Sequence, residues 1–379
     1  MRISTRSTVD PFLVMTVLAA ARAREAAGAD VVHMEIGQPG EPPPRRAIEA
    51  AAAAMRAGPL GYTEALGLPA LRERLSRRYA DRHGVAVPPE RIAITAGASG
   101  AFVLAFLALF EVGGRVALAD PGYPAYRNIL RALGLAPVGL PAEAADRFQP
   151  TAALLDAAGP LDGLLVASPA NPTGAALDRA ALGALVGDCR RRGLSLVSDE
   201  IYHGVEFGPP CASALEFGDD VVVVNSFSKY WRLTGWRVGW LAAPPEVIAA
   251  VERLAQSLFI CPSHVAQVAA LAALDADEEL APAVAAYRRN RDILAEALPP
   301  LGFTLPAPPD GAFYLYADAS RLTGDSAAFC ARMLVEAGVA ATPGADFDPV
   351  RGHTAVRFSV AGPTERIAEG ARRLAAWLG

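Results

Sequence analysis

The stretch Val221 to Trp240, VVVVNSFSKYWRLTGWRVGW, contains the only lysine of the chain, Lys229. Lysine and arginine together number 35, so the other 34 cationic side chains are arginine. A charged surface position accepts either residue, whereas a guanidinium group stays protonated and cannot condense with a carbonyl. Lys229 is either a lysine left by chance or a nucleophilic amine, and the residues around it decide between these interpretations.

The four valines 221–224 predict a fully buried strand of the kind found in parallel sheets. Small polar residues follow it, among them Ser226 and Ser228, and they suit a loop. In open α/β sheets, ligands bind just beyond the carboxyl ends of the strands. Lys229 therefore lies where a ligand is expected.

Ser226, Lys229 and Arg237 supply a hydroxyl, an amine and a guanidinium group close together in the sequence. Such a group suits an anionic phosphate beside an electrophilic carbon, and pyridoxal phosphate has both. The string SFSK, followed by Arg237 and Gly239, closely resembles the cofactor-lysine motif of class I/II aminotransferases, which are fold type I pyridoxal-phosphate enzymes. The resemblance covers nearly the whole chain and implies that Lys229 holds pyridoxal 5'-phosphate as a Schiff base.

Composition excludes several other classes of protein. The chain has 379 residues, 52% of them hydrophobic and 20% charged, which suits a soluble globular protein of two domains. A net charge of -5 argues against nucleic acid as the main partner. The four cysteines are scattered and suggest neither a disulfide framework nor a metal site, and no lysine follows a glycine as a Walker loop requires.

The amino terminus loosely mimics a secretion signal, because Arg2 and Arg6 precede the apolar run Phe12 to Ala21. Asp10 and Pro11 interrupt the layout of such a signal, and the helical pattern continues beyond the run. We therefore expect a helix over 10–27 and a cytoplasmic protein. No apolar run reaches membrane-spanning length.

Several apolar segments predict strands that each end at a candidate site residue. These segments are 91–95, 115–119, 161–167, 194–197 and 221–224. One polar residue after a strand means little, but five that each suit a part of the same cofactor favour a common site. The predicted fold is α/β, and the resemblance implies a mostly parallel seven-stranded sheet flanked by helices, with a smaller α+β domain. We expect residues 1–40 and 286–379 to form the smaller domain and 41–285 the large one. Helices are also expected over 45–57 and from 245 to about 296, and further short strands at 303–305 and 312–317.

Two segments are expected to bind the cofactor phosphate. Gly97, Ala98 and Ser99 open an apolar helix, where free N–H groups and the helix dipole favour an anion; the alternative is a plain N-cap at Ser99. The segment GYTEALGLPALR resembles the family's Y-x-x-x-x-G-x-x-x-L-R, in which the tyrosine, here Tyr62, reaches the phosphate of the neighbouring subunit. That resemblance implies a homodimer with shared sites, whereas a loop aromatic at a core edge is the alternative.

Two further motifs are expected to contact the cofactor ring, one by stacking on its face and the other by a hydrogen bond to its oxygen. Tyr123, in DPGYPAY, presents an aromatic face that could stack on a flat heterocycle, while Tyr126 is expected to be structural. The string SPANPTG at 168–174 matches the family closely, although turn chemistry alone explains its prolines and glycine. The resemblance implies that Asn171 hydrogen-bonds the ring 3-hydroxyl.

Asp199 is a carboxylate at the end of an apolar strand, where burial is costly unless the carboxylate meets a cation or a donor. A pyridinium nitrogen is such a cation, and pairing would keep the ring a good electron sink. Tyr202 follows three residues later and could donate to the ring oxygen. The match is to the family's D-E-x-Y.

Substrate binding is predicted at Gly37, Asn171 and Arg357. Gly37 is a plain turn on sequence alone, but the family's G-[EQ]-P places this backbone near the substrate. Arg357 lies inside a predicted strand and could point outward by alternation. R-F-S-x-A after P-G-x-x-F resembles the family's carboxylate-binding arginine, whose planar fork suits a bidentate clamp. Phe12, Ile36, Tyr123 and Phe259 could line an apolar side-chain pocket.

The hypothesis is an aminotransferase that moves an amino group between an L-amino acid and a 2-oxo acid in a ping-pong cycle. Lys229 carries the proton, and Asp199 and Tyr202 complete the catalytic set. A carbon–sulfur β-lyase or a decarboxylase on the same scaffold would share these residues. A regulatory module would need a separate DNA-binding domain, for which 36 residues before Gly37 are too few. A non-catalytic homologue would have no reason to keep its only lysine here.

Overall fold

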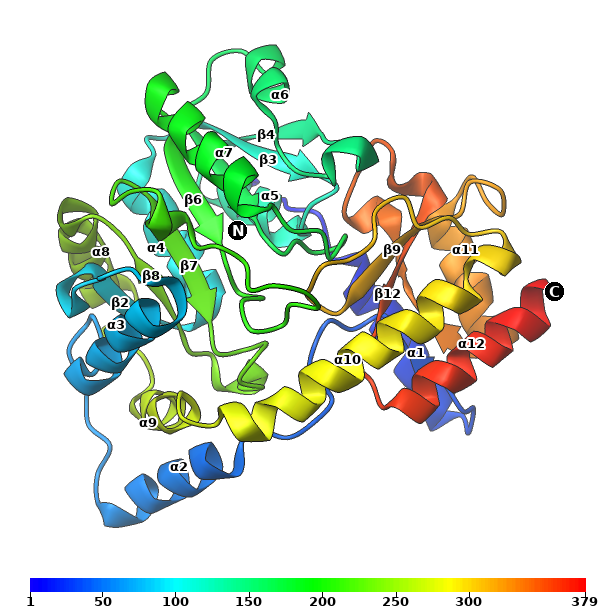
Figure 1. Cartoon of the computed structure of the whole chain (residues 1–379), viewed down its shortest axis with the longest axis horizontal. Coiled ribbons are helices and arrows are strands. Elements are labelled where there is room, and N and C mark those ends of the chain that lie inside the picture. Colours follow the sequence, from blue (N-terminus) through cyan, green and yellow to red (C-terminus); the bar gives the residue numbers. More distant parts are fainter.

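A computed structural model describes residues 1–379, and a seven-stranded sheet forms the centre of its larger part (Figure 1). The strand order is β2-β8-β7-β6-β5-β3-β4, and every neighbouring pair is parallel except the two that β8 makes. The strands are β2 (Ile92–Thr95), β3 (Arg115–Asp120), β4 (Ala136–Pro141), β5 (Gly163–Ala167), β6 (Ser195–Asp199), β7 (Val222–Ser226) and β8 (Gly239–Ala242). The expected mostly parallel seven-stranded sheet is confirmed.

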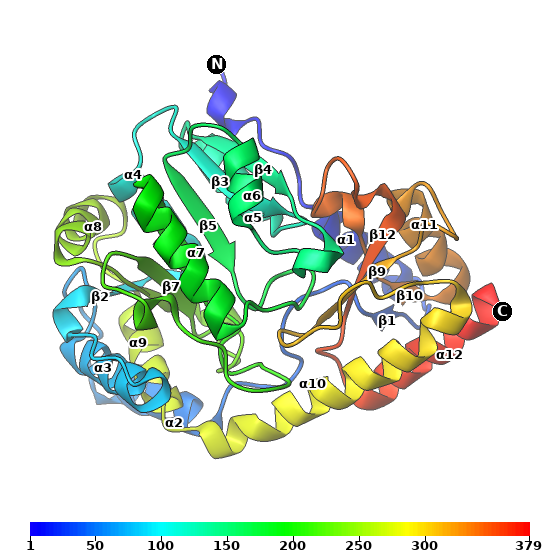
Figure 2. The same ribbon diagram turned by 45° about the horizontal axis from the view of Figure 1, so that its top comes forward.

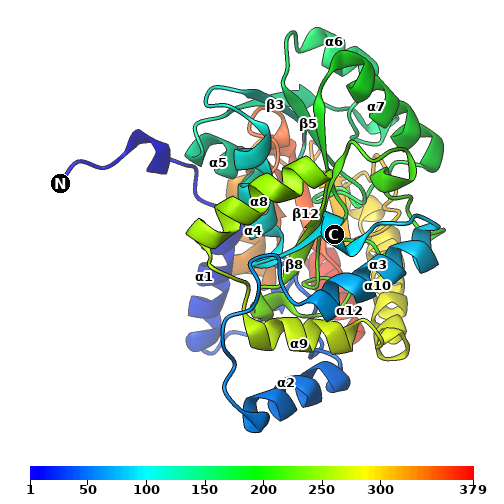
Figure 3. The same cartoon turned by 90° about the vertical axis from the view of Figure 1, so that its left-hand side faces the viewer.

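Helices cover both faces of this sheet, which explains why its strands are almost continuously apolar (Figure 3). Alternation along β7 is an example, because Val223 packs in one core and its neighbours Val222 and Val224 pack in the other. One face carries α3 (Pro69–His83), α7 (Arg179–Arg192) and α9 (His264–Ala273), and the other carries α4 (Gly97–Leu109), α5 (Pro124–Ala132) and α8 (Pro245–Leu258). The short α6 (Ala152–Ala157) follows β4, and α2 (Arg45–Ala57) packs on α9.

A second layered region combines the two ends of the chain. Its antiparallel sheet has the order β11-β12-β9, and β1 pairs in parallel with β10. The elements are α1 (Leu13–Ala26), β1 (Val32–His33), α10 (Asp277–Ala297), β9 (Tyr314–Asp318), α11 (Ser326–Arg332), β10 (Val339–Ala340), β11 (Thr342–Pro343), β12 (Ala355–Ser359) and α12 (Thr364–Leu378). Figure 2 shows α10 and α12 side by side along one edge of this region.

Some boundaries differ from the sequence prediction for local reasons. The expected helix over 10–27 begins at Leu13, after Pro11, and the long helical stretch 245–296 is divided into α8, α9 and α10. The strand expected at 303–305 is wrong, because only one isolated bridge, from Thr304 to Asp318, forms before Pro306. Edge strand β4 was not predicted, since its sequence APVGLP contains proline and glycine, which edges tolerate. No helix is both long and apolar enough to cross a membrane.

Candidate active site

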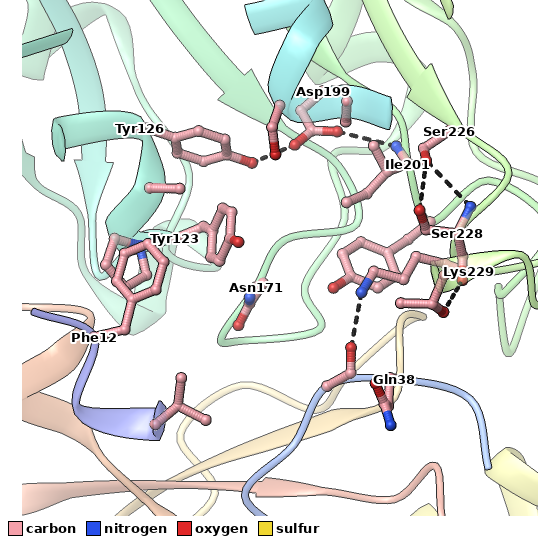
Figure 4. Close-up of a pocket in the computed structure, with 18 of the residues that line it drawn as sticks. Phe12, Gln38, Tyr123, Tyr126, Asn171, Asp199, Ile201, Ser226, Ser228 and Lys229 are labelled. Atoms are coloured by element: carbon pink, nitrogen blue, oxygen red, sulfur yellow. Dashed lines mark hydrogen bonds between the residues drawn. The ribbon is translucent and has the colours of Figure 1, made fainter. Parts of the chain in front are cut away.

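A cavity of about 370 Å³ lies where the carboxyl ends of the main sheet's strands face the second layered region (Figure 4). Strands β5, β6 and β7 are parallel, so the residues that follow them reach the same edge of the sheet. The predicted site residues in its wall are Gly37, Ala98, Ser99, Tyr123, Asn171, Asp199, Tyr202, Ser226, Lys229, Arg237 and Arg357. Gly97 lies just behind the wall, and Tyr62 does not line the cavity.

Lys229 points into this cavity, and its Nζ donates a hydrogen bond to the carbonyl oxygen of Gly37 over 2.7 Å. Burial and, after it, the charges of Arg357 and Arg237 together lower the pKa of Lys229 to about 8, while the charge of Asp199 opposes this shift. An appreciable fraction of this lysine is therefore a neutral amine near pH 7 to 8, which is the form that attacks carbonyl groups.

Asp199 is the last residue of β6 and is 2% exposed. Its Oδ1 accepts a hydrogen bond from the backbone N–H of Ile201 over 3.0 Å, and its Oδ2 accepts one from the hydroxyl of Tyr126. Burial raises the pKa of Asp199 to about 6, and these two donors oppose the rise. Above that pH the cavity holds a buried carboxylate that can pair with a cationic group of a ligand.

The amino terminus of α4 forms an anion cradle with the loop after β7. Helix α4 begins at Gly97 and no side chain caps it, so Ser99 lies in the first turn and the alternative of a cap at Ser99 is wrong. Gly97 has φ +70, a left-handed conformation that favours glycine, and a Cβ there would lie 2.5 Å from Arg237 Nη2 and displace that side chain. The hydroxyl of Ser226 donates to Ser228 over 2.8 Å. Free N–H groups, hydroxyls and a guanidinium group suit a phosphate.

Tyr123, Asn171 and Tyr202 also line the cavity, and Figure 4 shows the first two. The hydroxyls of Tyr202 and Tyr314 share a hydrogen bond of 2.9 Å. Asn171 Oδ1 accepts from Arg357 Nη1 over 2.9 Å. An aromatic face, an amide and a phenol thus surround the space beside Asp199, which suits a flat heterocycle with a polar oxygen.

Arg357 points into the protein, and the alternative of an outward arginine is wrong. It lies on β12, the middle strand of its sheet, and is 3% exposed. Its Nη2 donates to Thr342 Oγ1 over 3.1 Å and to the carbonyl oxygen of Glu35. The guanidinium carbon lies 4.4 Å from the ring centroid of Tyr314, and the buried Nε has no partner. An unpartnered donor beside the cavity is what a ligand carboxylate would satisfy.

The remaining wall is apolar and comes largely from the start of α1. Phe12, Val14 and Met15 line it with Ile36 and Phe347. Asp346 holds this helix in place, because its carboxylate accepts from the backbone N–H groups of Leu13 (3.0 Å) and Val14 (3.3 Å). The predicted pocket residue Phe259 is absent from the wall and lies at the end of α8.

Tyr62 is 83% exposed in the loop between α2 and α3, so the alternative of a tyrosine packed at a core edge is wrong. Its loop contacts the segment after α8, since His264 bonds to the carbonyl oxygen of Gly61 over 3.0 Å. Phe259 and Ile260 in that segment are also exposed. These three exposed side chains make this part of the surface apolar, and nothing in the single chain covers them.

The sequence prediction missed Tyr314, Thr342 and Asp346 and gave Tyr126 only a structural role. Tyr314 stacks against Arg357 and bonds to the hydroxyl of Tyr202, and Thr342 accepts a hydrogen bond from Arg357. Asp346 holds the start of α1. The only signal in the sequence was the spacing of Tyr126, three residues after Tyr123 and in the first turn of α5. The others come from segments whose distance from their partners in sequence hides the contact.

Comparison with known proteins gives one answer. The model of the family described as aminotransferase class I and II matches residues 29–374. A valine–pyruvate aminotransferase of Mycobacterium tuberculosis is 47% identical, over 100% of this chain and 98% of the relative. An aminotransferase structure from the same organism has a TM-score of 0.98 at 46% identity, covering 100% of this chain and 99% of the other. A putative aminotransferase from Silicibacter pomeroyi has a TM-score of 0.94 at 53% identity, with the same coverage.

These similarities favour transamination over the lyase or decarboxylase alternative, because the relatives are named aminotransferases. The family implies pyridoxal phosphate as cofactor, with an amino acid and a 2-oxo acid as substrates. The chain therefore belongs to the class I and II aminotransferases, and it is an enzyme with transaminase activity.

Proposed function

We propose that this enzyme uses pyridoxal 5'-phosphate, bound to Lys229 as a Schiff base, to exchange an amino group between an apolar L-amino acid and a 2-oxo acid. The proposal rests on a single cavity that contains the amine of Lys229 with its lowered pKa, the buried carboxylate of Asp199 and the uncapped amino terminus of α4. Each matches a different part of the cofactor. When bound, the cofactor supplies an aldehyde for the amine and an electron sink for the substrate.

The residues present fit this cofactor. Asp199 would pair with the ring nitrogen, Tyr123 would stack on the ring, and Asn171 and Tyr202 would bond to the ring oxygen. The phosphate would be held by Gly97, Ala98, Ser99, Ser226 and Arg237, with Tyr62 of the partner subunit. The support lies in the donor set: N–H groups, hydroxyls and guanidinium at one end, and a carboxylate at the other.

Lys229 would move the proton of the substrate Cα, and its depressed pKa suits this role. A general base works best when its pKa lies near the operating pH, and burial brings the pKa of Lys229 to about 8. Its Nζ lies against the Gly37 backbone, which is also where the substrate is expected. Tyr202, whose ring centroid lies 6.0 Å from the Lys229 Nζ, would orient the cofactor ring during transfer.

Arg357, with Asn171 and Gly37, would bind the substrate carboxylate. Hydrogen bonds from both Nη atoms of Arg357 and its stacking on Tyr314 orient the guanidinium group before a ligand arrives, and its Nε remains free. Oriented groups cost less conformational entropy on binding. The clamp would place the Cα within reach of Lys229, which lines the same cavity.

The substrate side chain would be apolar. Phe12, Met15, Ile36 and Phe347 form the wall beyond the carboxylate clamp. The only arginines in the wall are Arg237 and Arg357, which are assigned to the phosphate and to the carboxylate. The wall that one chain builds therefore offers no further cation for a distal carboxylate. A relative named for valine and pyruvate supports an aliphatic amino acid with pyruvate as acceptor.

We further propose a cytoplasmic homodimer in which Tyr62 enters the partner's cavity. The exposed side chains of Tyr62, Phe259 and Ile260 support a buried interface there. We also propose the division into a large domain, 41–285, and a smaller one made of 1–40 and 286–379. The pairing of β1 with β10 supports the assignment of the amino-terminal segment to the smaller domain.

A half-reaction screen tests the proposal. The cofactor-loaded protein is mixed with single L-amino acids, and loss of the visible absorbance of the bound cofactor is followed by stopped flow. Valine, leucine and alanine should bleach it at least about tenfold more efficiently than aspartate or glutamate. Ammonia and pyruvate released from cystathionine without an oxo-acid acceptor would instead select the lyase. Equal reaction with aspartate would contradict the apolar substrate class.

A further inference from the structure

Tyr126, to which the sequence analysis gave only a structural role, contacts the carboxylate of the candidate active site. It lies in the first turn of α5, is 4% exposed, and its hydroxyl donates a hydrogen bond to Asp199 Oδ2 (Figure 4). Asp199 is the carboxylate assigned to the cofactor's ring nitrogen. A position that only had to fill the core would accept phenylalanine equally well, whereas a buried tyrosine hydroxyl needs a partner, which here is the carboxylate of Asp199.

The ring of Tyr126 is held on both sides. It lies edge-on to Phe102 and to Tyr123, with centroid separations of 5.3 Å in each case. Tyr123 is the residue proposed to stack on the cofactor. One side chain thus contacts both the stacking ring and the carboxylate, so its position links the two.

The hydroxyl is the donor in this bond. Burial, and then the charge of Asp199, hold the pKa of Tyr126 well above its usual value, so the phenol stays protonated. Burial raises the pKa of Asp199 to about 6, and the hydrogen bond from Tyr126 is the foremost influence that lowers it. A donor to the ionised form of a carboxylate favours that form.

We propose that Tyr126 is a positioning residue that keeps Asp199 ionised and correctly oriented for the ring nitrogen of the cofactor. It acts through Asp199, whose Oδ1 is oriented by the Ile201 N–H in the same way. The inference rests on the proposed function, because it needs a cationic ring nitrogen beside Asp199. It goes beyond that function because it gives Tyr126, which was not among the predicted site residues, control over the charge of Asp199.

The test is the pH dependence of cofactor affinity in Tyr126→Phe. The apoprotein is titrated with pyridoxal phosphate and followed by absorbance and tryptophan fluorescence, between about pH 6 and about pH 9. Affinity should fall about tenfold at the acidic end, where the unassisted carboxyl takes up a proton, and less than about threefold at the alkaline end. The acidic limb of the binding curve therefore moves to higher pH.

Two matched variants separate this role from simple packing. Tyr79→Phe removes a buried hydroxyl of the same domain that accepts from Trp240 Nε1 over 3.0 Å, on the other face of the sheet. It should leave the affinity unchanged at both ends of the pH range. In an Asp199→Asn background, Tyr126→Phe should lose its pH-dependent effect, because the amide cannot ionise.

A replacement that keeps the shape covers the case in which Tyr126→Phe does not fold. Incorporating 3-fluorotyrosine at 126 strengthens the donor, and the acidic limb should then move to lower pH. An equal loss of affinity at every pH, in both backgrounds, would overturn the proposal and leave Tyr126 a packing residue. Failure of the unmodified apoprotein to bind pyridoxal phosphate would refute the proposed function instead.

Discussion

The cavity has two sides that are built in different ways. One side, here called the floor, consists of residues at the ends of β6 and β7, with Asp199, Ser226 and Lys229 as its main members. The other, the roof, comes from the start of α1 and from the sheet that holds Arg357. Each floor residue lies at or within a few residues of a strand end, whereas the roof joins segments as distant as Leu13 and Asp346, 333 positions apart.

The difference separates two tasks. The floor carries groups suited to the cofactor, which is the same for every substrate, and its geometry follows from parallel strands in one rigid sheet. The roof carries the carboxylate clamp and the apolar wall, which decide which amino acid is accepted. We therefore expect floor substitutions to affect all substrates alike, and roof substitutions to affect substrate binding while cofactor binding survives.

The largest effect is expected at Lys229. Lys229→Ala should lower turnover at least about a thousandfold for every amino acid, because no other group condenses with the cofactor. The visible absorbance of the bound cofactor should disappear as well. Lys229→Arg is the matched control, since it keeps the charge but cannot condense and should be equally inactive. Activity in either variant would show that the floor has another nucleophile.

Arg357 is the corresponding test of the roof. Arg357→Gln should lower kcat/KM about a hundredfold for all monocarboxylic amino acids, because the bidentate clamp is lost. Cofactor affinity, measured by titrating the apoprotein, should change less than about threefold. A parallel loss of cofactor affinity would contradict the separation between the two sides.

Asp346 tests the attachment of α1. Asp346→Ala removes the acceptor for the N–H groups of Leu13 and Val14, so the apolar wall should loosen. KM for valine should rise about tenfold at nearly unchanged kcat, because each lost bond to a carboxylate weakens the bound form. Asp346→Asn, which keeps one oxygen acceptor, should show a smaller rise. An unchanged KM in both variants would mean that α1 needs no such tether.

The smallest effect concerns the pH at which Lys229 reacts. The rate at which the apoprotein captures pyridoxal phosphate should rise as the pH increases through about 8, since the neutral amine is populated above the pKa of Lys229. Arg357 lowers that pKa, so Arg357→Gln should move the midpoint to higher pH. The rate would be measured by stopped-flow absorbance at several pH values. A midpoint near that of free lysine would show that burial does not perturb the amine.

The sheet and most of the floor could be predicted because their signals are local. A valine run followed by SFSK predicts both a buried strand and the loop at its end, and β7 is found at Val222–Ser226. The helix over 45–57 was predicted with the bounds that α2 has. The expected strand at 303–305 failed because pairing needs a neighbour, and the bridge to Asp318 extends over one residue only.

The sequence by itself indicated a pyridoxal-phosphate enzyme, because a lone lysine among arginines and a set of contiguous motifs each match a part of that cofactor. It left transamination and a lyase reaction open, and the named relatives favour transamination. Only the tertiary structure decided that Tyr126 bonds to Asp199, that Asp346 anchors α1, and that Arg357 faces inward. Hydrogen bonds between distant segments depend on how layers pack, and no spacing along the chain encodes that packing. The sequence could name Phe12, Ile36 and Arg357 as pocket candidates, but only the packing of the two ends of the chain against each other shows how they enclose one cavity.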